Sequence, residues 1–240
     1  MNTRSITNLF YAFLLCILLD PLVWAAPTGY MLPTAIPSEP AQQIALRKTL
    51  ISKTPGLRIE DDWKKVALLY VSNAADAPPA DITTLREAED WILAARAVYP
   101  KDAELMALEG SVTCMKARNP KIDGTLAMTY ARQGFRQLDK AVMSDPQSLG
   151  ARLQRGITLL RVPRFLGKTE LAENDLEFVL DQLPARSDGR TLELRAMLYY
   201  LLGDALTAAG QPARARQLWQ QAAALQAPVW SSKARAKLPS

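Results

Sequence analysis

One spacing recurs four times in this 240-residue sequence, and it constrains the fold more than any other feature. In each copy a small residue is followed four positions later by a large apolar residue, and a proline comes eight or nine positions after that. A separation of four places two residues on the same helix face, and proline ends a helix because it has no amide hydrogen to donate. The sequence therefore predicts four helices that end alike. Their small, large and proline residues are Ala88, Ile92 and Pro100; Gly134, Leu138 and Pro146; Ala172, Leu176 and Pro184; and Ala215, Trp219 and Pro228.

Three of these helices are preceded by a predicted helix that contains a glycine, at Gly110, Gly156 or Gly203. A glycine inside a helix costs about 1 kcal/mol relative to alanine, and a close contact with a neighbouring helix is the usual compensation. We therefore expect each glycine to lie against the following helix at its small residue. Each such pair of helices would form a tight hairpin.

Helical periodicity continues through the chain from Ala41 onward. Alanine and leucine dominate, 49% of the residues are hydrophobic, and no segment alternates convincingly as a strand would. Thr84 and Glu87 match a capping box, a side-chain motif that begins many helices. A helical bundle without repeats is the alternative architecture. The predicted helices cover residues 39–53, 60–74, 84–98, 102–117, 125–143, 148–161, 168–183, 191–209, 212–226 and 229–237.

The last predicted hairpin resembles the tetratricopeptide repeat consensus. The earlier units are degenerate, and their extra residues fall in the turns at 118–124 and 161–167, where a helical solenoid tolerates insertions. Over residues 60–228 the resemblance implies an all-α, right-handed solenoid of antiparallel hairpins. About three to four degenerate repeats would have extra N-terminal helices and a C-terminal capping helix. The matching positions of the last hairpin are Tyr199, Leu202, Gly203, Leu206, Ala215, Trp219 and Ala222.

Two further segments bear on this architecture. Trp230 is followed by Lys233, Arg235 and Lys237, which predicts a short capping helix with its apolar side inward and its basic side outward. The turn at 163–167 resembles part of the periplasmic helical-repeat proteins that are associated with TRAP-type solute transporters. That resemblance implies, as an alternative function, a solute-binding accessory protein of an envelope transporter.

The first 25 residues have the pattern of a secretory signal peptide. Arg4 supplies the positive charge, residues 9–19 form an apolar run of eleven, and Val23 and Ala25 suit a signal peptidase site that ends at Ala25. An uncleaved membrane anchor is the alternative, but the run is shorter than the roughly 20 residues that cross a bilayer. We expect a periplasmic or secreted protein with no stable membrane insertion after cleavage. The predicted parts are a signal peptide at 1–25, a proline-rich extended segment at 26–40 and a helical domain at 41–240.

The residue inventory argues against catalysis. The chain has no histidine, the commonest general base and metal ligand, and it shows no phosphate loop, dinucleotide fingerprint or metal-ligand spacing. Asp175 and Glu177, like Asp61 and Asp62, are interpreted as solvated carboxylates, and Cys114 as a small buried residue rather than a reactive thiol. Basic residues exceed acidic ones by five but are scattered, so no nucleic-acid partner is expected. We predict a protein that is not an enzyme and uses no metal or cofactor.

In tetratricopeptide proteins the first helix of each hairpin lines a concave groove that holds partner peptides. The resemblance implies that the candidate binding residues are Leu153, Ile157, Arg161, Tyr200 and Asp204. The same side chains would also suit a core packed beneath the N-terminal helices, and the sequence leaves both interpretations open. The predicted function is an exported protein-interaction module, a scaffold or assembly factor that binds a peptide or helix of another envelope protein. The solute-binding role and an enzyme of unrecognised type are the alternatives.

Expression of the full chain in a bacterial host is expected to yield a mature protein that begins at Ala26, because residues 1–25 carry the features that a signal peptidase recognises. N-terminal sequencing of the purified protein measures the cleavage site directly. A retained Met1, or a lipid attached to Cys16, would contradict the prediction.

Overall fold

The computed structural model describes residues 41–42, 44–45, 48–49, 67, 71, 78–79, 81–184 and 189–239. All of them belong to one compact unit, 31–240. The signal peptide predicted at 1–25 and the proline-rich segment predicted at 26–40 both lie outside the described residues. Within the two predicted N-terminal helices, every described residue is helical. The bounds of those two helices stay predictions.

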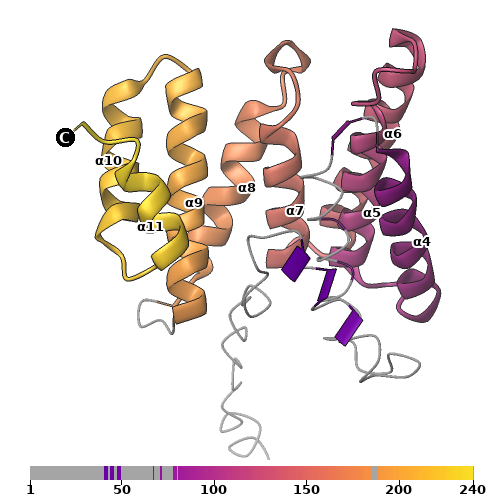
Figure 1. Cartoon of the computed structure of the whole chain (residues 1–240), viewed down its shortest axis with the longest axis horizontal. Coiled ribbons are helices and arrows are strands. Elements are labelled where there is room, and N and C mark those ends of the chain that lie inside the picture. The colour runs from indigo at the N-terminus through magenta and orange to yellow at the C-terminus, as the bar shows by residue number, and fades with distance from the viewer. Residues whose placement is uncertain are drawn as a thin grey trace, which may run out of the picture. The chain divides into compact units, whose positions relative to one another are not determined.

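Eight α-helices and one short 3-10 helix make up the ranges 81–184 and 189–239 (Figure 1). These ranges contain no strand, so the all-α prediction is confirmed for the described part of the chain. No helix in that part has the length and apolar character needed to cross a membrane. The elements are α4 (Ile82–Val98), α5 (Ala103–Lys116), α6 (Gly124–Ser144), α7 (Leu149–Leu160), η1 (Arg164–Leu166), α8 (Thr169–Gln182), α9 (Gly189–Ala208), α10 (Pro212–Ala224) and α11 (Pro228–Arg235).

Consecutive helices pack against each other in pairs, which confirms the predicted hairpins. The pairs are α5 with α6, α7 with α8, and α9 with α10, and Figure 1 shows them following one another in chain order. Each hairpin also contacts the next, because α5 packs against α7 and α8 packs against α9. Helices α5, α7 and α9 are therefore the first helices of three hairpins, and α6, α8 and α10 are the second helices.

The core beneath α4 includes residues from the predicted helix at 60–74. Ala67 and Val71 are buried in one apolar cluster with Ala88 and Ile92 of α4 and Leu105 of α5. Ala67 and Val71 therefore share a core with α4. Helix α4 therefore has the position of a second helix, in front of the α5–α6 hairpin.

The glycines contact the following helices as predicted, but the atoms nearest to Gly203 belong to the large residue Trp219 rather than to the small residue Ala215. A Cβ atom added to Gly156 of α7 would lie 2.6 Å from Leu176 Cδ2 of α8. A Cβ atom added to Gly203 of α9 would lie 2.7 Å from Trp219 Cδ1 of α10. Real Cβ contacts are not this short, so a larger residue at either position would push the facing side chain out of place. Leu138, Leu176 and Trp219 fill the room that Gly110, Gly156 and Gly203 leave.

The start of α4 differs from the predicted capping box. The N-cap is Asp81, whose carboxylate accepts backbone hydrogen bonds from Thr83 and Thr84, each at 3.1 Å. The hydroxyl of Thr84 donates to the same carboxylate at 2.8 Å, and these hydrogen bonds lower the pKa of Asp81. The assignment of Thr84 as the cap was wrong, because a carboxylate three residues earlier satisfies the free amides and complements the positive end of the helix dipole.

A buried ion cluster joins α7 and α8 to α6, and it corrects a second expectation. Asp175 of α8, expected to be solvated, is fully buried. Its carboxylate accepts hydrogen bonds from Arg155 Nε at 2.6 Å, from Arg155 Nη2 at 2.9 Å and from Arg152 Nη1 at 3.0 Å. Arg155 also donates from Nη1 to Asp139 of α6 at 3.0 Å. Asp175 is buried because it shares a helix face with Ala172, three residues before it.

The C-terminal helix α11 is fastened to the last hairpin, as expected of a capping helix. The hydroxyl of Ser231 donates to the carbonyl oxygen of Ala222 at 2.7 Å. The carboxylate of Glu193, on α9, accepts hydrogen bonds from the first backbone amides of α11, at 3.1 Å from Val229 and 3.3 Å from Trp230. One end of α11 is therefore tied to both α9 and α10.

Gly134→Ala is expected to lower the free energy of unfolding by about 1–3 kcal/mol, the usual cost of overfilling a packed contact. The new Cβ atom would lie 2.8 Å from the carbonyl oxygen of Gly110 and 2.9 Å from the backbone nitrogen of Cys114, and backbone atoms cannot move aside cheaply. Urea unfolding measures the difference. Gly124→Ala is the matched control, because it lies in the same helix with nothing within 4 Å of its added Cβ. Equal stability of the two variants would refute the close contact.

Asp175→Ala is expected to lower the free energy of unfolding by about 3 kcal/mol or more, because the buried Arg155 loses its main partner. Asp204→Ala is the control, since its ion pair with Lys237 is partly exposed, with side-chain exposures of 38% and 40%. Such a pair contributes about 1 kcal/mol or less. Thermal and urea unfolding of both variants provide the comparison, and similar losses would show that burial does not strengthen the Asp175 cluster.

Candidate functional site

The predicted binding residues on and after α7 lie at different depths. Leu153 is 1% exposed and belongs to the core. Ile157, one turn later, is half-buried, and Arg161, directly after the helix, is exposed. For Leu153 the structure therefore favours the core interpretation over direct contact with a partner. Ile157, on α7, and Arg161, at its C-cap, are both accessible.

The predicted binding residues on α9 are accessible in part and contact the C-terminal segment. The ring of Tyr200 lies 5.5 Å from that of Trp230, measured between centroids, with a tilt of 53° between the planes. Lys237 Nζ lies 5.4 Å from the centroid of the Tyr200 ring and 3.0 Å from the carboxylate of Asp204. The hydrogen bond with Asp204 is the main reason that the pKa of Lys237 is raised. Tyr200 and Asp204 are thus brought together by one lysine.

The five predicted residues form two groups in the structure. Helix α7 packs extensively against α5 and α8, whereas α9 packs against α8, α10 and α11. Leu153, Ile157 and Arg161 therefore belong to one hairpin, and Tyr200 and Asp204 belong to the next one together with α11. A role of these residues in binding a partner stays a prediction.

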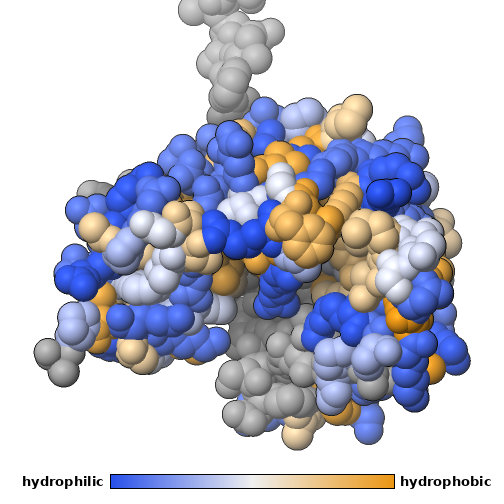
Figure 2. All heavy atoms as spheres, turned by 90° about the horizontal axis from the view of Figure 1, so that it is seen from above, coloured by the Kyte–Doolittle hydropathy of each residue, from blue (hydrophilic) through white to orange (hydrophobic). Residues whose placement is uncertain are grey.

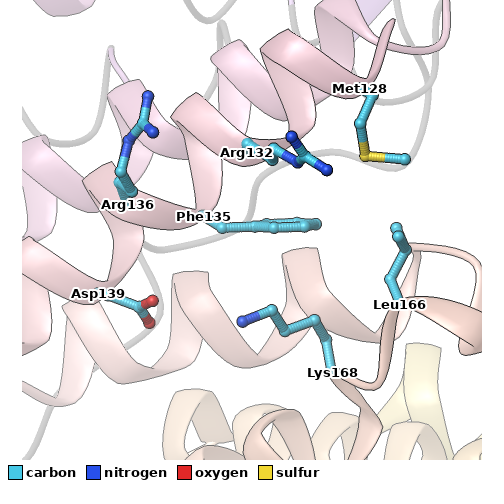
Figure 3. A pocket seen from close by; sticks show the side chains of 7 residues that line it. All are labelled: Met128, Arg132, Phe135, Arg136, Asp139, Leu166 and Lys168. Atoms are coloured by element: carbon cyan, nitrogen blue, oxygen red, sulfur yellow. The ribbon is translucent and has the colours of Figure 1, made fainter. Parts of the chain in front are cut away.

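A cleft that the sequence did not predict lies between α6 and the turn that contains η1. Its volume is about 440 Å³ (Figure 3). Five of its residues come from successive turns of α6, one comes from η1, and one directly precedes α8. The lining residues are Met128, Arg132, Phe135, Arg136, Asp139, Leu166 and Lys168.

The lining of the cleft is basic around an aromatic ring. Figure 3 shows the ring of Phe135 in the middle of the cleft, with the side chains of Arg132 and Lys168 on either side of it in this view. Lys168 Nζ lies 5.3 Å from the centroid of the ring, a cation–π distance. Arg136 adds a third cation, and both arginines are exposed. The carboxylate in the lining, Asp139, already accepts a hydrogen bond from Arg155.

The turn that completes the cleft is built by its own backbone. Gly167 adopts the left-handed conformation, with φ of 65°, and its amide donates to the carbonyl oxygen of Arg164 at 2.9 Å. Leu166 packs against the apolar cluster that includes Phe135, so this side of the turn is held on the domain. Phe165, between Arg164 and Leu166, is 82% exposed. The sequence predicted an insertion at this turn and a resemblance to transporter-associated helical-repeat proteins, but it did not predict the cleft.

The arrangement of the cleft suits binding of an anionic group. Its cations and ring offer electrostatic attraction and apolar contact. No group of three or more potential metal ligands occurs among the residues that the structure describes. Cys114 is buried, and its burial raises the pKa of the thiol to about 12, which agrees with its interpretation as a small core residue.

Helical hairpins packed in chain order define the class of this fold. No protein-family model matches the sequence, and no curated protein matches it either. Among solved structures the chain is similar to the crystal structure of MamA, a protein of tetratricopeptide repeats, with a TM-score of 0.41 and 15% sequence identity. The matched region covers 81% of this chain and 90% of the MamA chain. At this level of similarity, the description of the fold rests on the helix contacts themselves.

Figure 2 shows a face of the molecule on which hydrophobic residues lie among strongly hydrophilic ones. Such a mixture is also found in the cleft, where Phe135, Met128 and Leu166 lie among basic side chains. Binding surfaces of proteins commonly combine apolar anchors with polar surroundings. The described surface therefore has more than one place where apolar and polar side chains lie next to each other.

Proposed function

We propose that this chain is an exported protein-interaction module of tetratricopeptide type, a scaffold or assembly factor of the cell envelope. The observation that carries the proposal is the group formed by Tyr200, Asp204, Trp230 and Lys237 at the last hairpin. It presents partly exposed aromatic rings and opposite charges that are already ordered by their mutual contacts. Preordered aromatic and charged side chains lose little conformational entropy when a partner binds.

The proposed partner is a peptide or helix of another envelope protein. Ile157 on α7 would provide apolar contact, and Arg161 at the C-cap of α7 would provide a guanidinium. Tyr200 and Asp204 would provide a ring and a carboxylate on α9. Arginine and tyrosine are enriched among the residues that dominate binding energy at interfaces. The proposed export to the periplasm or beyond is supported by the signal-peptide pattern of residues 1–25.

Arg161→Ala and Tyr200→Ala are expected to reduce the recovery of partners at least severalfold in photo-crosslinking of the envelope fraction, followed by mass spectrometry. Arg161→Ala is expected to keep the melting temperature, because its side chain is exposed. Tyr200→Ala is expected to lower it slightly through the lost contacts with Trp230 and Lys237. The matched control is Arg86→Ala, an exposed arginine on α4.

Full recovery of partners by both variants would refute the role of α7 and α9. A large loss of stability in Tyr200→Ala would instead identify Tyr200 as a core residue, since truncating a buried aromatic costs about 3–5 kcal/mol. The binding surface would then lie elsewhere on the domain.

A solute-binding accessory protein of an envelope transporter is the second candidate function. The observation in its favour is the cleft beside Phe135, because about 440 Å³ falls within the range of small-ligand pockets. Its three cations would attract a small organic anion. A rise in melting temperature with a free small carboxylate, abolished by Lys168→Gln, would support this role.

A further inference from the structure

We infer that the cleft between α6 and the η1 turn is a second docking site, which binds an acidic segment of a protein partner that also carries an aromatic or large aliphatic side chain. The site is built from a second helix and an inserted turn. It is therefore separate from the first-helix residues on which the proposed function rests. Its existence does not depend on whether Arg161 or Tyr200 binds anything.

The charge of the cleft points to an anionic partner. Arg132 and Arg136 lie one turn apart on α6, on the same helix face, and like charges at this spacing repel each other. Neither guanidinium forms an ion pair or hydrogen bond with another residue in the part of the chain that the structure describes. Lys168 adds a third positive charge from the opposite side of the cleft. Carboxylates of a partner would neutralise charges that the fold itself leaves uncompensated.

The acid in the lining does not weaken this argument. Asp139 is held by Arg155, whose Nη1 donates to it at 3.0 Å. Arg155 and Arg152 both bind the fully buried Asp175, so two carboxylates and two guanidiniums form one internal cluster whose formal charges balance. The charge of Asp139 is thus offset within this cluster, and the three cations of the cleft remain to attract a ligand.

The shape of the cleft requires an apolar group next to the acid. Phe135 is 8% exposed, so it forms a fixed floor rather than a mobile flap. Met128 and Leu166 border the same opening beyond the edge of the ring in Figure 3. The volume of about 440 Å³ accommodates one large side chain with flanking carboxylates. A purely charged ligand would leave this apolar lining without contact.

Phe165 extends the surface beyond the cleft. Its ring is 82% exposed, and it lies between the exposed Arg164 and the cleft residue Leu166. The turn is fixed by Gly167 and by the packing of Leu166, so the backbone that carries the Phe165 ring is held in place. An exposed, preordered aromatic beside an arginine is typical of residues that anchor a protein interface.

A peptide fits these observations better than a nucleic acid. Nucleic acids are bound by cations arranged along a path that follows the phosphate backbone, with aromatic rings exposed for base stacking. Here Arg132 and Lys168 lie on either side of a recess whose floor is a nearly buried ring and whose edges are a thioether and an aliphatic side chain. Such a recess suits the side chain of a peptide better than the phosphate backbone of a nucleic acid.

The test is an array of immobilised twelve-residue peptides in which the numbers of glutamates and phenylalanines are varied independently. The probe is the mature chain with a fluorescent label. Binding is expected to rise with glutamate content only in peptides that also contain phenylalanine, and to weaken with salt. The double variant Arg132→Glu and Arg136→Glu is expected to bind at least about tenfold more weakly, because two charge-assisted contacts become repulsive. Phe165→Ala is expected to weaken binding severalfold.

The control for net charge is the double variant Arg86→Glu and Arg216→Glu, which changes the same number of exposed arginines on α4 and α10. Circular dichroism checks that all variants keep their helices. Equal losses in both double variants, binding that follows glutamate alone, or no binding to any peptide would each overturn the inference. Tighter binding to a twelve-nucleotide single-stranded DNA would assign the cleft to nucleic acid. Displacement of the peptides by millimolar glutarate would assign it to a small solute.

Discussion

The guanidinium of Arg155 fixes the relation between neighbouring hairpins. It is 8% exposed, and it is bound to a fully buried carboxylate on α8 and to a second carboxylate on α6. Burial alone would lower the pKa of this arginine, but the hydrogen bonds and negative charges of Asp175 and Asp139 raise it on balance. A buried charge that loses its partner is strongly destabilising, so the three helices are held in the one arrangement in which all these groups are paired.

Most of the fold could be predicted because its signals are local. The recurring small and large residues, the prolines and the glycines are properties of single helices or of adjacent ones. Gly156 and Gly203 accordingly contact the helices that the sequence pattern indicated. The predicted start of α4 was wrong because two neighbouring polar residues could each have been the N-cap. Asp81, not Thr84, caps α4. Both residues stand near the start of the same periodic segment, so the sequence alone did not distinguish them.

The ion cluster and the candidate site could be predicted less well, because each depends on distant residues. Asp175 was interpreted as solvated because the acidic Glu177 lies close to it in the sequence. Only its position on the same helix face as Ala172 indicated burial. Its partner Arg155 lies twenty residues earlier, on another helix. The depth of Tyr200 similarly depends on Trp230, and the cleft exists only because an inserted turn meets α6. The spacing of residues within one helix gives no information on these contacts between different helices.

The fastening of α11 has a consequence for assembly. Arrays of helical repeats grow by stacking, since the exposed side of the last hairpin can accept another hairpin from the same chain or from a neighbouring molecule. Here α11 packs on both helices of that hairpin, with its first amides bound by Glu193 and with Ser231 bound to Ala222. Helix α11 therefore occupies surface of both α9 and α10 that a further stacked hairpin would need.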